Sequence, residues 1–146
     1  MMTRIVLAVA VAALGVTAVV AQGDPIAARK ALMKENGGQS RIAREMMEGK
    51  QPFNLAAAKK ALTTFEASAT KAKALFPANS KTGGETAALP AIWEKKADFE
   101  AKLAKFGADA KAAEGKVKDL ASFKAEMAVV GKNCGGCHND YRAKKS

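Results

Sequence analysis

The sequence predicts an all-α protein, folded as an antiparallel four-helix bundle. Three observations support this fold class. In three segments the apolar residues recur at alternating intervals of three and four, which places one apolar stripe along each helix, as in the buried seam of a bundle. Alanine and lysine abound after the first 21 residues, whereas β-branched residues are scarce there. No alternating pattern typical of a strand lasts more than a few residues.

Residues 1–21 have the pattern of a secretory signal peptide. A single base, Arg4, precedes an apolar run of 17 residues that ends in Val19-Val20-Ala21, with side chains of modest size at the last and third-last positions. We expect cleavage before Gln22, so that residues 22–146 form one domain that is free of the membrane. An uncleaved membrane anchor is the alternative, but the apolar run is at the short limit for a membrane span.

The first helix of the bundle is predicted to start at Asp24. This residue suits the N-cap, and Pro25 suits the first helical position, where its missing N–H leaves no bond unmade. Residues 49–52 end the helix. The segment Glu35-Asn36-Gly37-Gly38-Gln39 interrupts its apolar stripe, and each interior glycine costs about 1 kcal/mol relative to alanine. The glycine pair indicates either a bend or the close approach of a neighbouring backbone, such as that of a partner subunit.

The other three helices follow from caps and stripes. Asn54 is the expected N-cap of the second helix, and a long loop covers residues 77–90. Loops of this length are often functional. The third helix is expected from residue 90 or 95 to Glu114, and a turn at residues 115–119 leads into the fourth. The three stripes comprise Leu55, Ala58, Leu62, Phe65, Ala69, Ala72 and Phe76, then Phe99, Leu103, Phe106, Ala110, Ala113 and Val117, then Leu120, Phe123, Met127, Val130, Cys134, Cys137 and Tyr141.

The sequence Cys134-Gly135-Gly136-Cys137-His138 contains both cysteines and the only histidine of the chain. Two thiols at this spacing add to the two vinyl groups of haem, and the histidine that follows ligates the iron. On a helix the three side chains belong to one turn. We therefore predict one haem c near the C-terminus of the bundle, attached covalently through Cys134 and Cys137, with His138 as the iron ligand.

Other chemistries fit this motif less well. Zinc would need carboxylate ligands, since the chain has no further Cys or His. A thioredoxin-like dithiol needs βαβ surroundings, and a disulfide at a spacing of three within a helix has poor geometry. No methionine follows His138. Any sixth iron ligand must therefore come from upstream, or the iron has an open position.

Four further residues are candidates for the haem pocket. Arg29 and Met33, one turn apart on the first helix, offer a cation for a propionate and an apolar group over the ring, although a surface charge and core filling are the plain alternatives. Trp93 is either a plug at the start of the third helix or a wall of the pocket. Arg142 follows His138 by one turn, where it either opposes protonation of the imidazole or is a solvated residue at the helix end.

The chain is basic, with a net charge of +10 that becomes +9 without residues 1–21, because Arg4 is their only charged residue. Such a balance attracts acidic partners and raises encounter rates. Aromatic residues are few and no Arg-rich tract is present, so nucleic-acid binding is not expected. Enzymatic activity is not expected either, because no second histidine is available for peroxide-type acid–base chemistry.

Together these motifs resemble the cytochrome c′ family, four-helix-bundle c-type cytochromes of the bacterial periplasm. The resemblance rests on the haem motif with Tyr141-Arg142, on Arg29-Lys30-Ala31-Leu32-Met33, and on the two segments Lys81-Thr82-Gly83-Gly84-Glu85-Thr86 and Leu89-Pro90-Ala91-Ile92-Trp93. It implies a periplasmic location and a homodimer that pairs through the first two helices.

The same resemblance implies roles for individual residues. His138 would be the proximal ligand of a five-coordinate, high-spin haem, flanked by Arg142, and Met33 would cover the other iron face. Arg29 would bind a propionate, and the last two implied residues, Glu85 and Thr86, would line the haem edge.

Two functions follow from these expectations. One is one-electron transfer with an acidic periplasmic redox partner, and the other is binding of small gases such as NO and CO at an open iron position. Low-spin relatives of the same class use a methionine of the first helix as sixth ligand. Met33 is therefore either a ligand or a lid.

Overall fold

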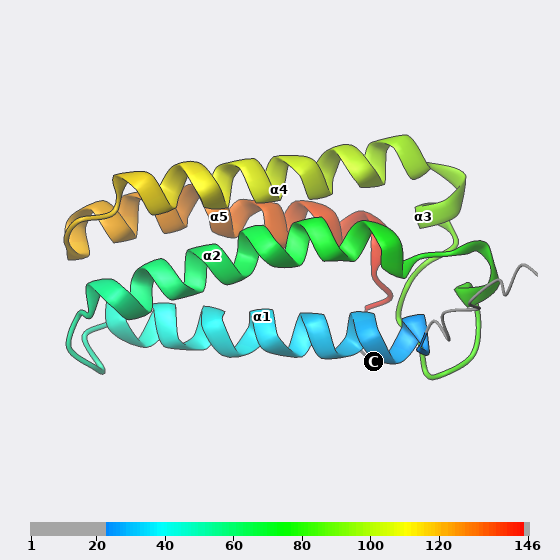
Figure 1. The fold of residues 1–146 in the computed structure, drawn as a ribbon, viewed down its shortest axis with the longest axis horizontal. Helices are drawn as coiled ribbons and strands as arrows, with labels where there is room; N and C mark the ends of the chain where they lie inside the picture. The colour runs from blue at the N-terminus through cyan, green and yellow to red at the C-terminus, as the bar shows by residue number, and fades with distance from the viewer. Residues whose placement is uncertain (1–22, 145–146) are drawn as a thin grey trace, which may run out of the picture.

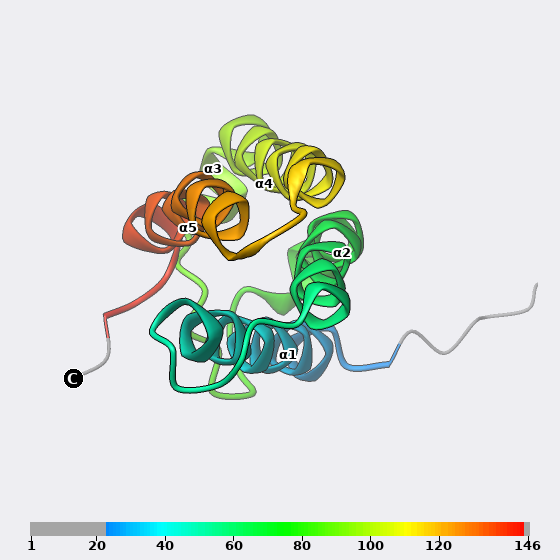
Figure 2. The same cartoon turned by 90° about the vertical axis from the view of Figure 1, so that its left-hand side faces the viewer.

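The computed structural model describes residues 23–144, in which four long helices run alternately up and down (Figure 1). The long helices are α1 (Pro25–Met47), α2 (Leu55–Ala72), α4 (Lys96–Lys116) and α5 (Leu120–Tyr141), and the α2–α4 connection contains the 3-10 turns η1 (Lys73–Leu75) and η2 (Ala78–Ser80) and the short helix α3 (Ala91–Glu94). The view along the bundle shows α1, α2, α4 and α5 end-on, arranged as the four sides of one bundle (Figure 2). The predicted all-α four-helix bundle is confirmed.

The predicted signal peptide at residues 1–21 lies outside the described residues. Within residues 23–144 no helix is both long and apolar enough to cross a membrane.

Side-chain caps set the starts of three long helices. Both predicted caps are confirmed, since Asp24 accepts a hydrogen bond from the Ile26 backbone N–H at 2.8 Å and Asn54 accepts one from Ala57 at 2.9 Å. Asp119 caps α5 in a reciprocal arrangement with Ser122, in which each side chain bonds the other residue's backbone. These bonds satisfy N–H groups that have no partner within the helix.

Of the two predicted starts of the third helix, the one at residue 95 is confirmed, because α4 begins at Lys96 and Lys95, with a φ of −116° and a ψ of 44°, is not helical. Two other details of the predicted helices were wrong. α2 ends at Ala72 rather than at Phe76. Leu55 begins α2 but is 40% exposed, because the first turn of the helix projects beyond the core.

Gly37-Gly38 neither bends α1 nor meets a neighbouring backbone within residues 23–144, and the approach of a partner subunit there stays a prediction. α1 runs unbroken through the pair, and a Cβ added to either glycine would meet no atom within 4 Å. The close approach occurs instead at Gly107 of α4, where an added Cβ would stand 3.1 Å from the Ala69 Cβ of α2. Small residues at this crossing bring the two helices close together.

The core divides into two clusters along the bundle. One cluster is centred on Phe65, Met46 and Phe123, and the other joins Leu32, Phe99 and Tyr141. α2 packs extensively on α1 and α4, and α4 packs on α5, whereas α1 and α5 make few contacts with each other. The bundle is therefore tightly closed on three sides and looser between α1 and α5.

The Gly107 contact predicts a steric requirement at the α2–α4 crossing. Gly107→Leu should lower the free energy of unfolding by about 1–3 kcal/mol, because the larger side chain overpacks a tight contact. Gly115→Ala is the matched control on the same helix, since an added Cβ there meets nothing within 4 Å. It should leave stability unchanged or raise it by up to about 1 kcal/mol. Urea unfolding monitored by circular dichroism measures both, and equal effects of the two variants would contradict the prediction.

The α5 cap predicts a pH-dependent contribution to stability. Hydrogen bonds from Ser122 hold the pKa of Asp119 below its ordinary value. The carboxylate therefore stabilises the fold above its unfolded-state pKa, and this contribution is lost as pH falls through the lower folded-state pKa. Asp119→Asn keeps a good cap but removes the titration. The stability of the natural chain relative to this variant should fall between pH 6 and pH 3 in urea unfolding experiments, and a pH-independent difference would rule the linkage out.

Candidate functional site

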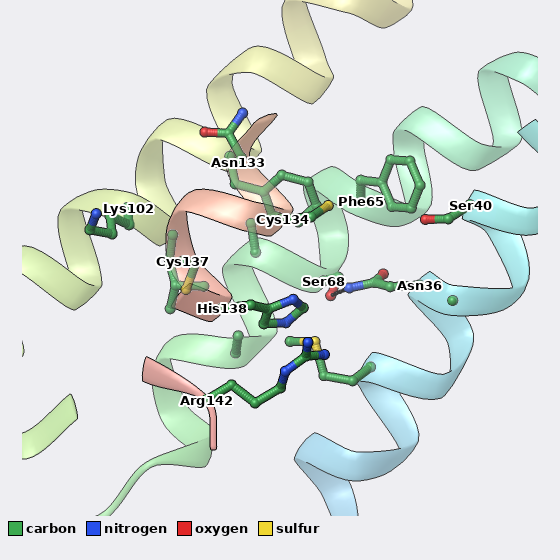
Figure 3. A pocket seen from close by; sticks show the side chains of 16 residues that line it. Asn36, Ser40, Phe65, Ser68, Lys102, Asn133, Cys134, Cys137, His138 and Arg142 are labelled. Carbon is green, nitrogen blue, oxygen red and sulfur yellow. Dashed lines mark hydrogen bonds between the residues drawn. The ribbon is translucent and has the colours of Figure 1, made fainter. Parts of the chain in front are cut away.

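The last turns of α5 bring together the three groups of the haem motif. Cys134, Cys137 and His138 all line one cavity of about 300 Å³ (Figure 3). Cys137 and His138 follow Cys134 by three and four residues, which is about one helical turn. The three side chains therefore lie next to one another on one face of α5. The remaining lining residues are Met33, Asn36, Gly37, Ser40, Phe65, Ser68, Ala69, Ala72, Lys102, Leu103, Phe106, Asn133 and Arg142.

Burial shifts the proton affinity of these groups. It raises the pKa of both Cys134 and Cys137, because a thiolate loses hydration inside the protein. The pKa of His138 is lowered, first by burial and second by the positive charge of Arg142. The imidazole is therefore uncharged at neutral pH, so that a ring nitrogen has a free lone pair for a metal.

The cavity wall formed by α1 and α2 lies opposite the haem motif and carries polar groups and a thioether. Met33 lines the cavity and is 38% exposed, so it is not packed as a core side chain. Asn36 follows it by three residues, on the same face of α1, and its Nδ2 donates a 2.7 Å hydrogen bond to Ser68 Oγ of α2. A thioether, an amide and a hydroxyl thus lie on one wall.

Two cations border the cavity. Lys102 of α4 pairs with Asp140 at 3.0 Å and donates to the Gly136 carbonyl at 3.4 Å, so it ties α4 to the last turns of α5. Arg142 is exposed at the end of α5 and forms a backbone bridge with Ala88. Arg142 is positioned to attract anionic groups at the edge of the cavity.

Arg29 does not line the cavity but clamps the connection between α2 and α4. Its guanidinium donates to the Leu75 carbonyl at 3.0 Å, to both the hydroxyl and the carbonyl of Ser80 at 2.9 and 2.8 Å, and to Thr86 Oγ1 at 2.6 Å. It also lies 4.8 Å above the Phe76 ring. Arg29 is only 5% exposed, so the alternative of a surface charge is wrong.

The other residues implied by the resemblance surround this clamp. Trp93 donates from its indole N–H to the carbonyls of Phe76 and Pro77, at 3.0 and 3.2 Å, which makes it a plug of the connection rather than a lining residue of the cavity. Glu85 is exposed and pairs with Lys30 at 3.5 Å. Thr86 is engaged by Arg29. Roles of these residues toward a haem stay predictions.

The sequence alone did not single out Asn36, Ser68 or Lys102 as lining residues. Asn36 lies in the polar interruption of the α1 stripe, and the interruption was its only signal in the sequence. Ser68 and Lys102 are small or charged residues whose position depends on how α2 and α4 pack.

The residues around the cavity fit a covalently held haem. Two unpaired thiols and a neutral imidazole open into one space with mostly apolar walls, and cations stand at its edge. The thiols form no disulfide in this structure, and within residues 23–144 no group of three His, Cys, Asp or Glu side chains clusters as a metal site would. A four-helix bundle with this site defines a c-type cytochrome of the bundle class.

Comparison with known proteins places the chain within this class. Residues 24–142 match the sequence model of the family described as Cytochrome C'. The chain is 47% identical to cytochrome c′ of Rhodopseudomonas palustris over the whole length of both proteins, and 41% identical to cytochrome c-556 of Agrobacterium fabrum, over 88% of this chain and 86% of the relative. The chain therefore belongs to the cytochrome c′ family, and like its members it carries one covalently bound haem c.

Solved structures agree with this assignment. The structure of Rhodopseudomonas palustris cytochrome c′ superimposes with a TM-score of 0.83 at 49% identity, covering 86% of this chain and all of the other. A structure of oxidised cytochrome c556 from the same organism gives a TM-score of 0.79 at 32% identity, with the same coverage. The resemblance read from the sequence is thus confirmed.

The Arg29 clamp predicts a large and local loss of stability on substitution. Arg29→Leu should lower the free energy of unfolding by about 3 kcal/mol, because it leaves buried acceptors unpaired. Arg29→Lys should recover only part of this loss, since one ammonium cannot bond four acceptors. Arg41→Ala is the control, because Arg41 is exposed and paired only with Glu45 of its own helix. It should change stability by less than about 0.5 kcal/mol.

Chemical denaturation measures these differences, and amide hydrogen exchange should show faster exchange in residues 75–88 of Arg29→Leu. An Arg29→Leu protein as stable as Arg41→Ala would contradict the clamp.

Proposed function

We propose that this chain is an exported, periplasmic one-electron carrier in which His138 ligates the haem iron and the second iron face admits small gases. The observation that carries the proposal is that both thiols and the imidazole open from α5 into one mostly apolar cavity. Bound haem supplies a one-electron couple at its iron. The residues of the chain hold the group, keep water away from it and set the charge around it.

Each residue has a distinct part in this proposal. Cys134 and Cys137 would hold the haem on α5, which fixes its plane relative to the helix. Burial and Arg142 lower the pKa of His138, which favours the neutral imidazole, in which one ring nitrogen has a free lone pair for the iron. Arg142, at the cavity edge, is the cation available to the haem propionates, whereas Lys102 is already paired with Asp140. Because Arg29 already bonds four acceptors, its proposed contribution is to keep the α2–α4 connection closed.

Met33 controls the second iron face. As a lid, it would cover the iron without a bond, and small gases such as NO and CO would bind beneath it. The second candidate is a six-coordinate, low-spin carrier with the Met33 thioether as ligand. It is favoured by the position of Met33 on the wall of the same cavity, with a side chain that the core does not lock in place.

Partners follow from charge and family. The net charge of +10 supports an acidic redox partner in the periplasm, reached through electrostatic steering. Membership of the cytochrome c′ family supports a homodimer through α1 and α2. Neither composition nor motifs support nucleic-acid binding or catalysis.

Spectroscopy of the haem-loaded protein tests the proposal. We expect high-spin optical and electron paramagnetic resonance spectra that change when NO or CO is added. In Met33→Ala the affinity for a bulky ligand such as an alkyl isocyanide should rise by about tenfold, because the lid is gone, a change that corresponds to about 1.4 kcal/mol. Met46→Leu is the matched control, since Met46 is 1% exposed in the core and does not line the cavity.

The opposite results are equally clear. A low-spin spectrum that becomes high-spin in Met33→Ala but not in Met46→Leu would establish Met33 as ligand and overturn the open iron face. A purified protein whose mass lacks the added haem would overturn the haem site itself.

A further inference from the structure

A buried phenol and its hydrogen-bond acceptor lie one turn beyond His138. Tyr141, the only tyrosine of the chain, is 3% exposed and packs in the apolar cluster that contains Leu32 and Phe99. Its hydroxyl donates to Asp98 Oδ2 of α4 at 2.5 Å. Attachment of haem and binding of gases at the iron do not require a phenol at this place, so the proposed function leaves the pair without a chemical role.

The two members of the pair have different surroundings. The ring of Tyr141 is enclosed by apolar side chains, whereas Asp98 is exposed on α4. On the inner side, Cys137, which precedes Tyr141 by four residues and is a haem attachment point, packs against the same apolar cluster. An electron can therefore pass from the ring toward the haem, while a proton passes from the hydroxyl to a carboxylate in contact with solvent.

Oxidation of a phenol depends on where its proton goes. Removal of an electron makes the hydroxyl strongly acidic, so the proton has to move to a base as the electron leaves. Exposed tyrosines use water or buffer as this base, but burial denies Tyr141 that route. The hydrogen bond to Asp98, together with burial, raises the pKa of Tyr141 to about 12, so the phenol is still protonated at neutral pH. Asp98 lies within the distance that direct proton transfer to a base requires.

The only tryptophan of the chain is less suited to the same chemistry. The cations of Arg29 and Lys81 lie 5.9 and 6.0 Å from the centroid of the Trp93 ring, and they oppose the formation of a positive charge on it. The indole N–H donates to backbone carbonyls, which are weak bases. Of these two side chains, Tyr141 is therefore the one that can lose an electron and a proton together.

We propose that Tyr141 and Asp98 act together as a one-electron donor that protects the haem against peroxide. The inference rests on the proposed open iron face, where hydrogen peroxide would react. The O–O bond of the peroxide breaks, and two molecules of water form on uptake of two electrons from the protein and two protons from solvent. In ferrous protein the haem iron supplies one electron and becomes ferric, and Tyr141 supplies the other. The phenolic O–H bond breaks at the same time, Asp98 receives the proton, and a neutral tyrosyl radical remains.

Reduction of the radical restores the pair. The next electron that the haem receives from its redox partner passes to the radical, and Asp98 returns the proton. The apolar cluster around the ring keeps water and other reactants away from the radical in the meantime. Without Tyr141, the second oxidising equivalent stays at the haem and attacks the porphyrin.

Electron paramagnetic resonance of the haem-loaded protein tests the donor. Ferrous protein that is mixed with excess hydrogen peroxide and frozen at once should give the signal of a tyrosyl radical, which has to come from Tyr141 because the chain has no other tyrosine. The signal should be absent from Tyr141→Phe, which keeps a ring in the apolar cluster, and the Soret band of this variant should bleach faster. Oxidation of the haem without a tyrosyl signal, or equal bleaching of the two proteins, would overturn the proposal.

Asp98→Asn separates proton transfer from the contact between α4 and α5. The amide oxygen still accepts a hydrogen bond from the phenol but is a much weaker base, so radical formation should slow by about a hundredfold. Glu100→Gln is the matched control, since Glu100 is a carboxylate of the same helix that pairs with Lys96 and not with Tyr141. It should leave the rate unchanged. Equal rates in all three proteins, as a purely structural role of Asp98 predicts, or equal slowing in the two variants, would contradict the role of Asp98 as the base.

The open iron face and the donor pair fail in different ways. If peroxide leaves the haem unchanged because Met33 ligates the iron, the open iron face is wrong, and photochemical oxidation of the ferric protein by ruthenium(III) tris-bipyridine then tests the pair by itself. The rate of tyrosyl formation should be independent of buffer concentration in the natural chain and dependent on it in Asp98→Asn. Dependence in both proteins means that Asp98 is not the base, which overturns the proposal. If peroxide oxidises the haem and no tyrosyl radical forms, the iron face is open and the pair is wrong.

Discussion

The close packing of α2 against α4 is the contact on which the arrangement of the bundle depends. Gly107 lacks a side chain at the point where α4 crosses Ala69, so the two helices come nearer than larger residues would allow. α1 then packs on α2, and α5 on α4, while α1 and α5 make few contacts with each other. Tight closure on three sides leaves the interior between α1 and α5 to the cavity, and all four long helices contribute to its lining.

Contacts of the next turn of α5 with α4 hold the turn that bears His138 in place. Tyr141, one turn later, is 3% exposed, packs edge-on against Phe99, and donates to Asp98 of α4 at 2.5 Å. This bond and burial raise the pKa of Tyr141 to about 12, so the phenol keeps its proton at any ordinary pH. Beyond it, the Ala88–Arg142 bridge ties the chain end to the α2–α4 connection. An iron ligand on this turn is therefore fixed by contacts that do not involve the iron.

Much of this structure could be predicted from the sequence, for reasons that are local. The helical period, the caps at Asp24 and Asn54 and the spacing of Cys134, Cys137 and His138 are all properties of a few neighbouring residues. Properties that arise between helices could not be predicted in the same way. Gly37-Gly38 and Gly107 are equally plain glycines in the sequence, and only the crossing of α2 and α4 makes Gly107 the close contact.

Arg29 illustrates the same limit. The sequence indicated Arg29 as a cation of the pocket. It does not show that the α2–α4 connection brings Leu75, Ser80 and Thr86 to the guanidinium. Asn36 was read only as part of a polar interruption, because its partner Ser68 is 32 residues away in the chain. Long-range pairing of polar groups depends on the packed structure and has no periodic signal.

In the proposed function, α5 holds the haem, whereas the opposite wall of the cavity, on α1 and α2, determines which ligands reach the iron. α5 carries both thiols and the imidazole on one turn, so the position of a haem depends on a single rigid segment. α1 carries Met33 and Asn36, one turn apart, and α2 carries Ser68, and a Cβ added at Gly107, at the crossing of α2 and α4, would meet none of these three side chains within 4 Å. Under the proposed function, substitution on this second wall would change what the iron meets without moving the haem. If the proposal holds, a few side chains on α1 and α2 decide whether this fold serves electron transfer alone or electron transfer with gas binding.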